Sequence, residues 1–183
     1  MTGYAPLISE RANCGPTVLA GVLRIDTEPA IELISKAIGK PWPGFTNVGH
    51  IRKALELKGY SMIKIENLAR AELDGDAVYN KPHPVMVFMQ ITGPWMGKGW
   101  RSEYNHTHWA LVTNEGILDV NNRDPEMDRP FWLIPSFWAN DVMNRLVDSV
   151  GGTDWFVRAC YEIKPTAIQT ILCLQPRPLE APP

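Results

Sequence analysis

The stretch HWALVTNEGILDVN, residues 108–121, contains two apolar runs joined by the short turn Asn-Glu-Gly. Two such runs on either side of a glycine-containing turn are typical of a β-hairpin. We therefore predict strands over 108–113 and 117–121. Because the strands of a hairpin are antiparallel, the stretch also indicates that the chain builds an antiparallel sheet.

Outside the hairpin, the apolar patterns divide the chain into a helical part and a strand-rich part. Helical spacing and capping residues predict three helices within the first 60 residues and a later helix that Ser136 caps and Gly151 ends. Further strands are predicted over 60–65, 84–91, 154–164 and 167–175. Helices followed by strands, without regular alternation, predict an α+β fold with N-terminal helices packed on an antiparallel β-sheet.

The domain organisation follows from the same patterns. We expect a single domain over residues 1–174, because no segment inside this range has the length and composition of a linker. The remaining residues, 175–183, are rich in proline and are expected to form an extended tail.

The composition of the 183 residues, 45% hydrophobic and 21% charged, is that of an ordinary globular protein. The 18 basic and 20 acidic side chains give a formal net charge of −2. Such a chain has no strong field to attract nucleic acid or an anionic membrane, so neither is expected as a partner. The first residues lack the features of a signal peptide, and no apolar run could span a bilayer. We expect a soluble protein without membrane insertion.

Among the three cysteines, Cys14 has the setting of a reactive thiol. Cys160 and Cys173 lie in strand-like runs, where buried and inert thiols are the usual case. Cys14 instead precedes Gly-Pro and a run with helical spacing, which places it at a predicted helix N-terminus. There the helix dipole favours the nucleophilic thiolate, and first-turn N–H groups can stabilise an oxyanion. The alternative is that Cys14 packs as an ordinary small apolar residue.

A nucleophilic thiol needs a histidine, and His108 is the best placed of the four. It begins the first strand of the hairpin, next to a long loop over 92–107, so the sheet would hold it rigidly. A third residue should accept a hydrogen bond from the other imidazole nitrogen. Asp119 on the second strand is the favoured candidate and Asn121 the competing one, and the register of the turn decides between them.

The order of these residues, cysteine at a helix start, histidine on one strand and an acid on the next, resembles that of the papain-like cysteine peptidase superfamily. Within it, the chain is most similar to the bacteriocin-leader peptidases and their stand-alone bacterial and phage relatives. The matching segments are NCGPTVLAGVL, KPHPVMVFMQI and HTHWALVTNEGILDVNN. The resemblance implies Cys14 as the nucleophile, His108 as the general base and acid, and Asp119 as the orienting residue.

The chain departs from the superfamily in one respect. Relatives generally carry a glutamine a few residues before the cysteine, which completes the oxyanion hole, and the segment PLISERAN contains none. Asn13 is the candidate replacement donor, and a donor from the 92–107 loop is the alternative. Trp109, next to His108, is the candidate substrate-binding residue. Loss of an oxyanion donor lowers turnover by about 100- to 1,000-fold, so the departure concerns the rate rather than the fold.

The resemblance implies a cysteine peptidase or amidase that cleaves an amide through an acyl-thioester on Cys14, without a cofactor. Candidate substrates are a peptide or isopeptide bond in a protein, or a cross-link in peptidoglycan, and acyl transfer to an amine is a variant of the same chemistry. We expect the protein in the cytoplasm or carried in a phage particle. The alternative is a papain-like scaffold with little or no turnover, which binds or assembles and uses its proline-rich tail to dock on a protein partner.

Two further sets of residues have competing interpretations. His106 and His108 form a His-x-His pair that could bind a metal with Cys14 or an acidic side chain, but no further ligands occur at metal spacing, so no metal is expected. Trp95 and Trp100 either line a substrate cleft or anchor the 92–107 loop. The remaining predictions concern core residues: Trp155, and Trp138, Val142, Leu146 and Val150 on one face of the later helix.

Overall fold

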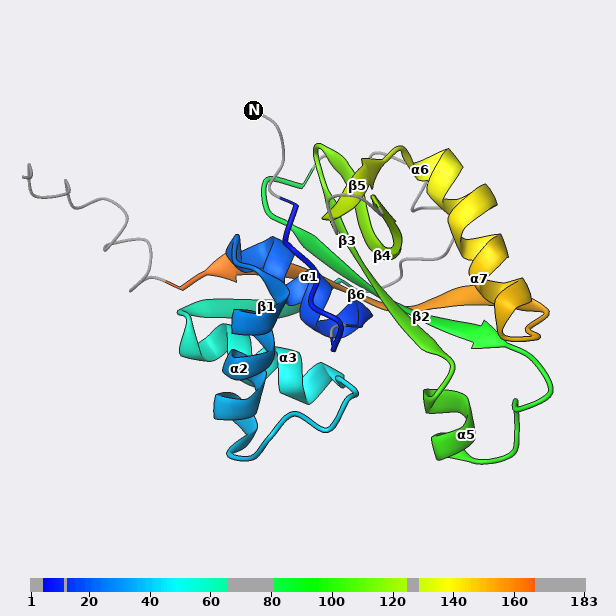
Figure 1. Cartoon of the computed structure of the whole chain (residues 1–183), viewed down its shortest axis with the longest axis horizontal. Coiled ribbons are helices and arrows are strands. Elements are labelled where there is room, and N and C mark those ends of the chain that lie inside the picture. Colours follow the sequence, from blue (N-terminus) through cyan, green and yellow to red (C-terminus); the bar gives the residue numbers. More distant parts are fainter. Residues whose placement is uncertain (1–4, 12, 66–80, 125–128, 167–183) are drawn as a thin grey trace, which may run out of the picture.

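The structure is a computed structural model that describes residues 5–11, 13–65, 81–124 and 129–166 (Figure 1). The helical elements of these residues are α1 (Cys14–Leu23), α2 (Thr27–Ile38), α3 (Val48–Leu57), α5 (Trp100–Tyr104), α6 (Pro135–Phe137), the π-helical turn η2 (Trp138–Val142) and α7 (Met143–Ser149). The strands are β1 (Tyr60–Ile65), β2 (Val85–Thr92), β3 (Thr107–Thr113), β4 (Gly116–Asp124), β5 (Arg129–Leu133) and β6 (Asp154–Pro165).

One antiparallel sheet, with the strand order β1-β6-β2-β3-β4-β5, organises the described part of the chain. Helices α1, α2 and α3 pack on one face of the sheet, and the α6–η2–α7 segment packs on the other (Figure 1). The predicted α+β class, with N-terminal helices on an antiparallel sheet, is confirmed. The predicted strand over 167–175, Cys173 and the proline-rich tail lie outside the described residues.

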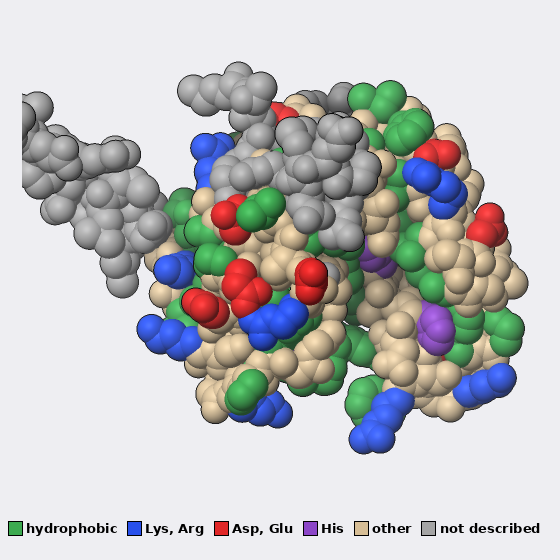
Figure 2. Space-filling view, viewed as in Figure 1, with side chains coloured by type: hydrophobic (Ala, Val, Ile, Leu, Met, Phe, Trp, Pro, Cys, Tyr) green, Lys and Arg blue, Asp and Glu red, His purple; other side chains and the backbone are tan. Residues whose placement is uncertain are grey.

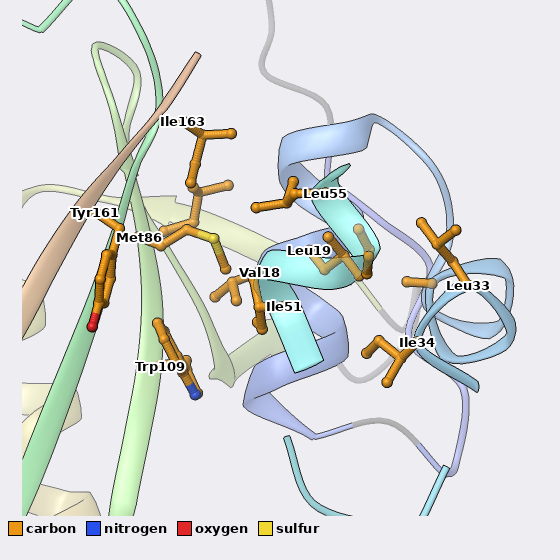
Figure 3. Packing of buried hydrophobic residues seen from close by; sticks show 14 of the residues in the cluster. Val18, Leu19, Leu33, Ile34, Ile51, Leu55, Met86, Trp109, Tyr161 and Ile163 are labelled. Atoms are coloured by element: carbon orange, nitrogen blue, oxygen red, sulfur yellow. The ribbon is translucent and has the colours of Figure 1, made fainter. Parts of the chain in front are cut away.

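Two apolar cores lie on opposite faces of the sheet, because the side chains of its central strands alternate between them. On β2, Val85 and Val87 belong to the core beneath α7, whereas Met86 and Phe88 belong to the core beneath the N-terminal helices. Figure 3 shows this second core, where helix residues such as Leu19 meet residues of the sheet. The sequence of a strand that is covered on both faces is a nearly continuous apolar run, as in β2.

The predicted regular helix from Ser136 to Gly151 is wrong in two respects. Pro135 takes the first helical position, so Ser136 does not cap the segment. In addition, η2 contains a wider turn than an α-helix, which rotates the residues that follow it. The buried residues of the segment are therefore Trp138, Val142, Met143 and Val147, whereas the regular pattern predicted Trp138, Val142, Leu146 and Val150.

The two tryptophans of the 92–107 segment have different surroundings. Trp95 is buried, stacks on the ring of His106 at a centroid distance of 3.6 Å, and donates its indole N–H to the carbonyl of Ile91 at 2.9 Å. Trp95 therefore anchors the segment. Trp100, at the start of α5, is 73% exposed and lines a cavity.

Candidate active site

Asn13 caps α1, and Cys14 is its first residue. The sequence predicts Cys14 at a helix start and indicates Asn13 only as an oxyanion donor. The Asn13 side-chain oxygen accepts a hydrogen bond from the backbone N–H of Gly15 at 3.2 Å. Its Nδ2 donates to the carbonyl of Gly44 at 2.7 Å. Cys14 is a free, half-buried thiol, and its own first-turn N–H has no intrahelical partner. Both the thiol and an N–H donor are therefore available at the helix start.

Thr46 fixes the segment before α3 against the start of α1. Its carbonyl accepts hydrogen bonds from the hydroxyl of Tyr104 and from the indole of Trp109, both at 3.3 Å. Its hydroxyl accepts one from the indole of Trp42 at 3.0 Å. A Cβ atom on Gly15 would lie 2.4 Å from the Cβ of Thr46, so only glycine permits this approach. The wall beside Cys14 is held in place from four segments of the chain.

The hairpin β3–β4 brings His108 and Asp119 together. Side chains alternate along a strand, so His108 points to the same face as Ala110, and Asp119 to the same face as Ile117. Both side chains are buried, and Nε2 of His108 lies 2.8 Å from Oδ2 of Asp119. Asn121, the competing candidate, has its Nδ2 at 3.4 Å from the same ring nitrogen. The shorter contact, to an oxygen that can accept, favours Asp119 as the partner of His108.

Trp138, in η2, supplies a second donor to Asp119. Its indole N–H donates to Oδ2 at 2.8 Å, so His108 and Trp138 share one carboxylate oxygen. The other oxygen, Oδ1, accepts the backbone N–H of Asn121 at 2.9 Å. The sequence predicts Trp138 only as a core residue. The available signal was that a buried indole N–H normally finds an acceptor.

The electrostatics of the site favour a charged pair. Burial alone would lower the pKa of His108, but the charge of Asp119 and hydrogen bonds to Asp119 and Cys14 outweigh it and raise this pKa to about 10. Burial would likewise raise the pKa of Asp119, but His108, followed by the Trp138 N–H, holds it below its ordinary value of 3.8. Because Asp119 engages Nε2 of His108, Nδ1 is left for the Cys14 thiol.

Two cavities meet at Cys14, and a third continues from one of them. The His108 cavity, of about 480 Å³, is lined by Asn13, Cys14, His108, Asn121 and Glu10, among others. The Trp109 cavity, of about 210 Å³, is lined by Asn13, Cys14, Thr46, Tyr104 and Trp109, among others. The Trp100 cavity, of about 470 Å³, continues from the Trp109 cavity and is lined by Phe45, Asn47, Trp100, Arg101, Tyr104 and Asn105. Figure 2 shows the surface hollowed between the part that carries α1–α3 and the part that carries α5–α7.

The remaining residues considered from the sequence, Trp109 and His106, lie outside the contact between His108 and Asp119. Trp109 is buried in the core beneath the N-terminal helices, and it also forms part of the wall of the Trp109 cavity. His106 does not join His108, because its ring stacks on Trp95 and its Nδ1 lies 2.8 Å from the carbonyl of Ser102. Across the described residues, no group of three or more His, Cys, Asp or Glu side chains is arranged to hold a metal ion. Glu10 was not predicted as a site residue, although it lies four residues before Cys14 and lines the same cavity.

No family model matches the sequence, and no match was found among curated proteins or among solved structures. Within the described ranges, the helices are all too short or too polar to cross a membrane.

We expect Trp138→Phe to destabilise the protein more than Trp155→Phe. The two indoles pack edge to face in the same core, with ring centroids 5.4 Å apart, and each substitution removes the same volume. Only the first removes a donor from the buried carboxylate of Asp119. A hydrogen bond to a charged group contributes about 1.5–3 kcal/mol, which is the expected difference in the free energy of unfolding, measured by urea denaturation at pH 7. Equal losses in the two variants would show that the indole N–H does not support Asp119.

Proposed function

We propose that the protein is a papain-like cysteine peptidase or amidase with Cys14 as its nucleophile. One observation carries the proposal: the free thiol at the start of α1 and the buried His108 line the same cavity, and Nε2 of His108 is held by the buried Asp119 at 2.8 Å. The papain-like fold is part of the same proposal. It is supported by a nucleophile-bearing helix that packs on an antiparallel sheet carrying the histidine and the acid.

The first half of the proposed reaction forms a thioester. The Cys14 thiolate attacks the carbonyl carbon of the substrate, and an imidazolium beside it favours the thiolate form. The Cys14 backbone N–H donates to the oxyanion. Asn13 adds a second donor through its remaining amide hydrogen, since the other one is bound to Gly44. As the C–N bond breaks, His108 gives its proton to the leaving amine.

The second half releases the acyl group. Neutral His108 takes a proton from water, the resulting nucleophile attacks the thioester carbon, and the C–S bond breaks to give a carboxylic acid and the thiol. Asp119, fixed by Trp138 and by the backbone of Asn121, keeps the imidazole oriented and stabilises its charged form. If an amine replaces water, the same steps transfer the acyl group. None of these steps uses a cofactor.

The proposed substrates are a peptide or isopeptide bond in a protein, or a peptidoglycan cross-link. The location in the cytoplasm or in a phage particle and the docking role of the tail stay predictions. The competing hypothesis, a scaffold without turnover, shares the fold and differs in the reactivity of Cys14.

Alkylation of Cys14 by iodoacetamide separates these two hypotheses. We expect fast labelling of the wild type at pH 6 and roughly 100-fold slower labelling of His108→Ala, because only the thiolate reacts and His108 favours it. Labelling is read by peptide mass spectrometry in the native protein.

Two controls belong to this experiment. His106→Ala removes a nearby imidazole that stacks on Trp95 and should leave the rate unchanged. Cys160 should stay unlabelled, because burial raises its pKa to about 12. Slow labelling of Cys14 that does not change in His108→Ala would contradict the cysteine-peptidase hypothesis and support a scaffold without turnover.

A further inference from the structure

His108 sets the direction in which a substrate crosses the site, an inference that rests on the proposed function. A general acid must contact the leaving amine, so the leaving group lies on the His108 side of Cys14. Two cavities meet at Cys14, and only the His108 cavity includes the imidazole. The leaving group therefore belongs in the His108 cavity, and the acyl part of the substrate belongs in the Trp109 cavity.

The acyl side leads to an aromatic surface. The Trp109 cavity shares Phe45, Tyr104 and Asn105 with the Trp100 cavity, so an extended chain bound at Cys14 can continue from one into the other. Phe45 and Trp100 are 52% and 73% exposed, and they reach this cavity from different segments. Exposed aromatic side chains that line a cavity of this size are typical of a binding site for an apolar group. Tyr104 is tied to Thr46, which keeps the wall rigid.

The two ends of the cleft carry opposite charges. Arg101, with its guanidinium 5.5 Å from the centre of the Trp100 ring, lines the Trp100 cavity and disfavours a cationic occupant there. Among the described residues of the His108 cavity, the charges of His108 and its partner Asp119 offset each other, and Glu10 adds a negative charge. Farther along, Arg145 is paired with Asp141 at 2.7 Å and does not cancel Glu10.

We propose that the cleft binds an extended peptide with a large apolar side chain on the acyl side and a cationic side chain on the leaving-group side. The apolar side chain packs between Phe45, Trp100 and Tyr104, and the cation faces Glu10. This assignment fixes both the polarity of the bound peptide and the chemistry on each side of the cleaved bond.

Digestion of a mixed peptide library, with the cleavage positions read by mass spectrometry, tests the assignment. We expect large apolar residues to be enriched on the acyl side and Lys or Arg on the leaving-group side. Trp100→Ala should lower kcat/KM for apolar acyl-side residues by about 10- to 100-fold, because burying such a side chain contributes that much. Glu10→Lys should replace the basic preference by an acidic one, with a change of about fivefold for an exposed charge pair.

Two variants serve as matched controls. Phe137→Ala removes an aromatic side chain that is 45% exposed and lines none of the three cavities. Glu115→Lys reverses an exposed charge in the turn between β3 and β4. Both should retain the wild-type cleavage pattern. A cleavage pattern that does not change in Trp100→Ala and Glu10→Lys would overturn the assignment, as would one that the two control variants change equally. In either case the proposed peptidase activity would stand.

Binding to Cys14→Ala distinguishes failure of the assignment from failure of the proposed function. The probe is a fluorescent peptide with leucine on the acyl side and lysine on the leaving-group side, compared by anisotropy with the peptide in which the two are exchanged. If the wild type cuts nothing but Cys14→Ala prefers the first peptide through Trp100 and Glu10, hydrolysis fails and the assignment stands. Equal binding of the two peptides, or no binding, overturns the assignment.

Discussion

Cys14→Ala is expected to abolish amide hydrolysis, with kcat lowered by about 10⁶-fold, because the thioester cannot form without the sulfur. The substitution should leave the fold intact. Cys14 is only half-buried, and the α1 cap is made by Asn13 and the backbone of Gly15. Activity is measured as release of a fluorophore from cleaved peptides, and the fold by circular dichroism and urea denaturation.

Cys160→Ala is the matched control for this result. It also removes a thiol, but one that lies in the core beneath α7 and lines none of the three cavities. We expect it to lower stability by creating a small cavity and to leave kcat at the wild-type value. If Cys14→Ala keeps its activity while Cys160→Ala loses it, the nucleophile has been assigned to the wrong residue.

Asp119→Ala is expected to lower the free energy of unfolding by about 3–5 kcal/mol, which is typical when one partner of a buried ion pair is removed. The loss leaves a buried imidazolium and the Trp138 indole without their acceptor. Asp119→Asn keeps the volume and one acceptor oxygen, so it should cost less stability. Both variants should lose most of the activity, because His108 is no longer held in the productive orientation and tautomer.

The difference between wild type and Asp119→Asn should depend on pH. The lowered pKa of Asp119 gives stability that is present above its unfolded value of 3.8 and is lost as the pH falls through the folded value. The raised pKa of His108 gives stability that is full below 6.5 and is lost as the pH rises towards about 10. Urea denaturation should show the largest difference between about pH 4 and 6.5. A difference that does not vary from pH 4 to 10 would contradict a charged pair.

The strands and the site were the parts most open to prediction from the sequence. Alternation with a period of two determines which face of the sheet a residue occupies, so the hairpin indicated that His108 lies opposite the strand that carries Asp119 and Asn121. The register of the turn, which the sequence leaves open, decides between these two residues. Cys14 could be placed because Gly-Pro followed by a helical pattern marks a helix start. These are local signals, and in the structure Cys14 and His108 line the same cavity while Asp119 contacts His108.

The missed features depend on contacts between distant segments. The sequence did not predict β5, whose five residues include Pro130, an unfavourable residue inside a strand. Nothing local indicates that the indole of Trp138 reaches Asp119, because that contact needs the segment after β5 to pack over the hairpin. Glu10 has no regular element around it, so its place in the His108 cavity follows only from the folding of the chain around α1.

The π-helical turn η2 shifts the angular position of side chains around the axis of the α6–η2–α7 segment. Each residue of an α-helix advances the side-chain direction by about 100°. A turn with one residue more than usual therefore changes the direction of the side chains that follow it relative to those that precede it. The first half aims Trp138 at the carboxylate, and the second half aims Met143 and Val147 at the sheet. The segment can thus be anchored by its second half while its first half stays aligned to the site.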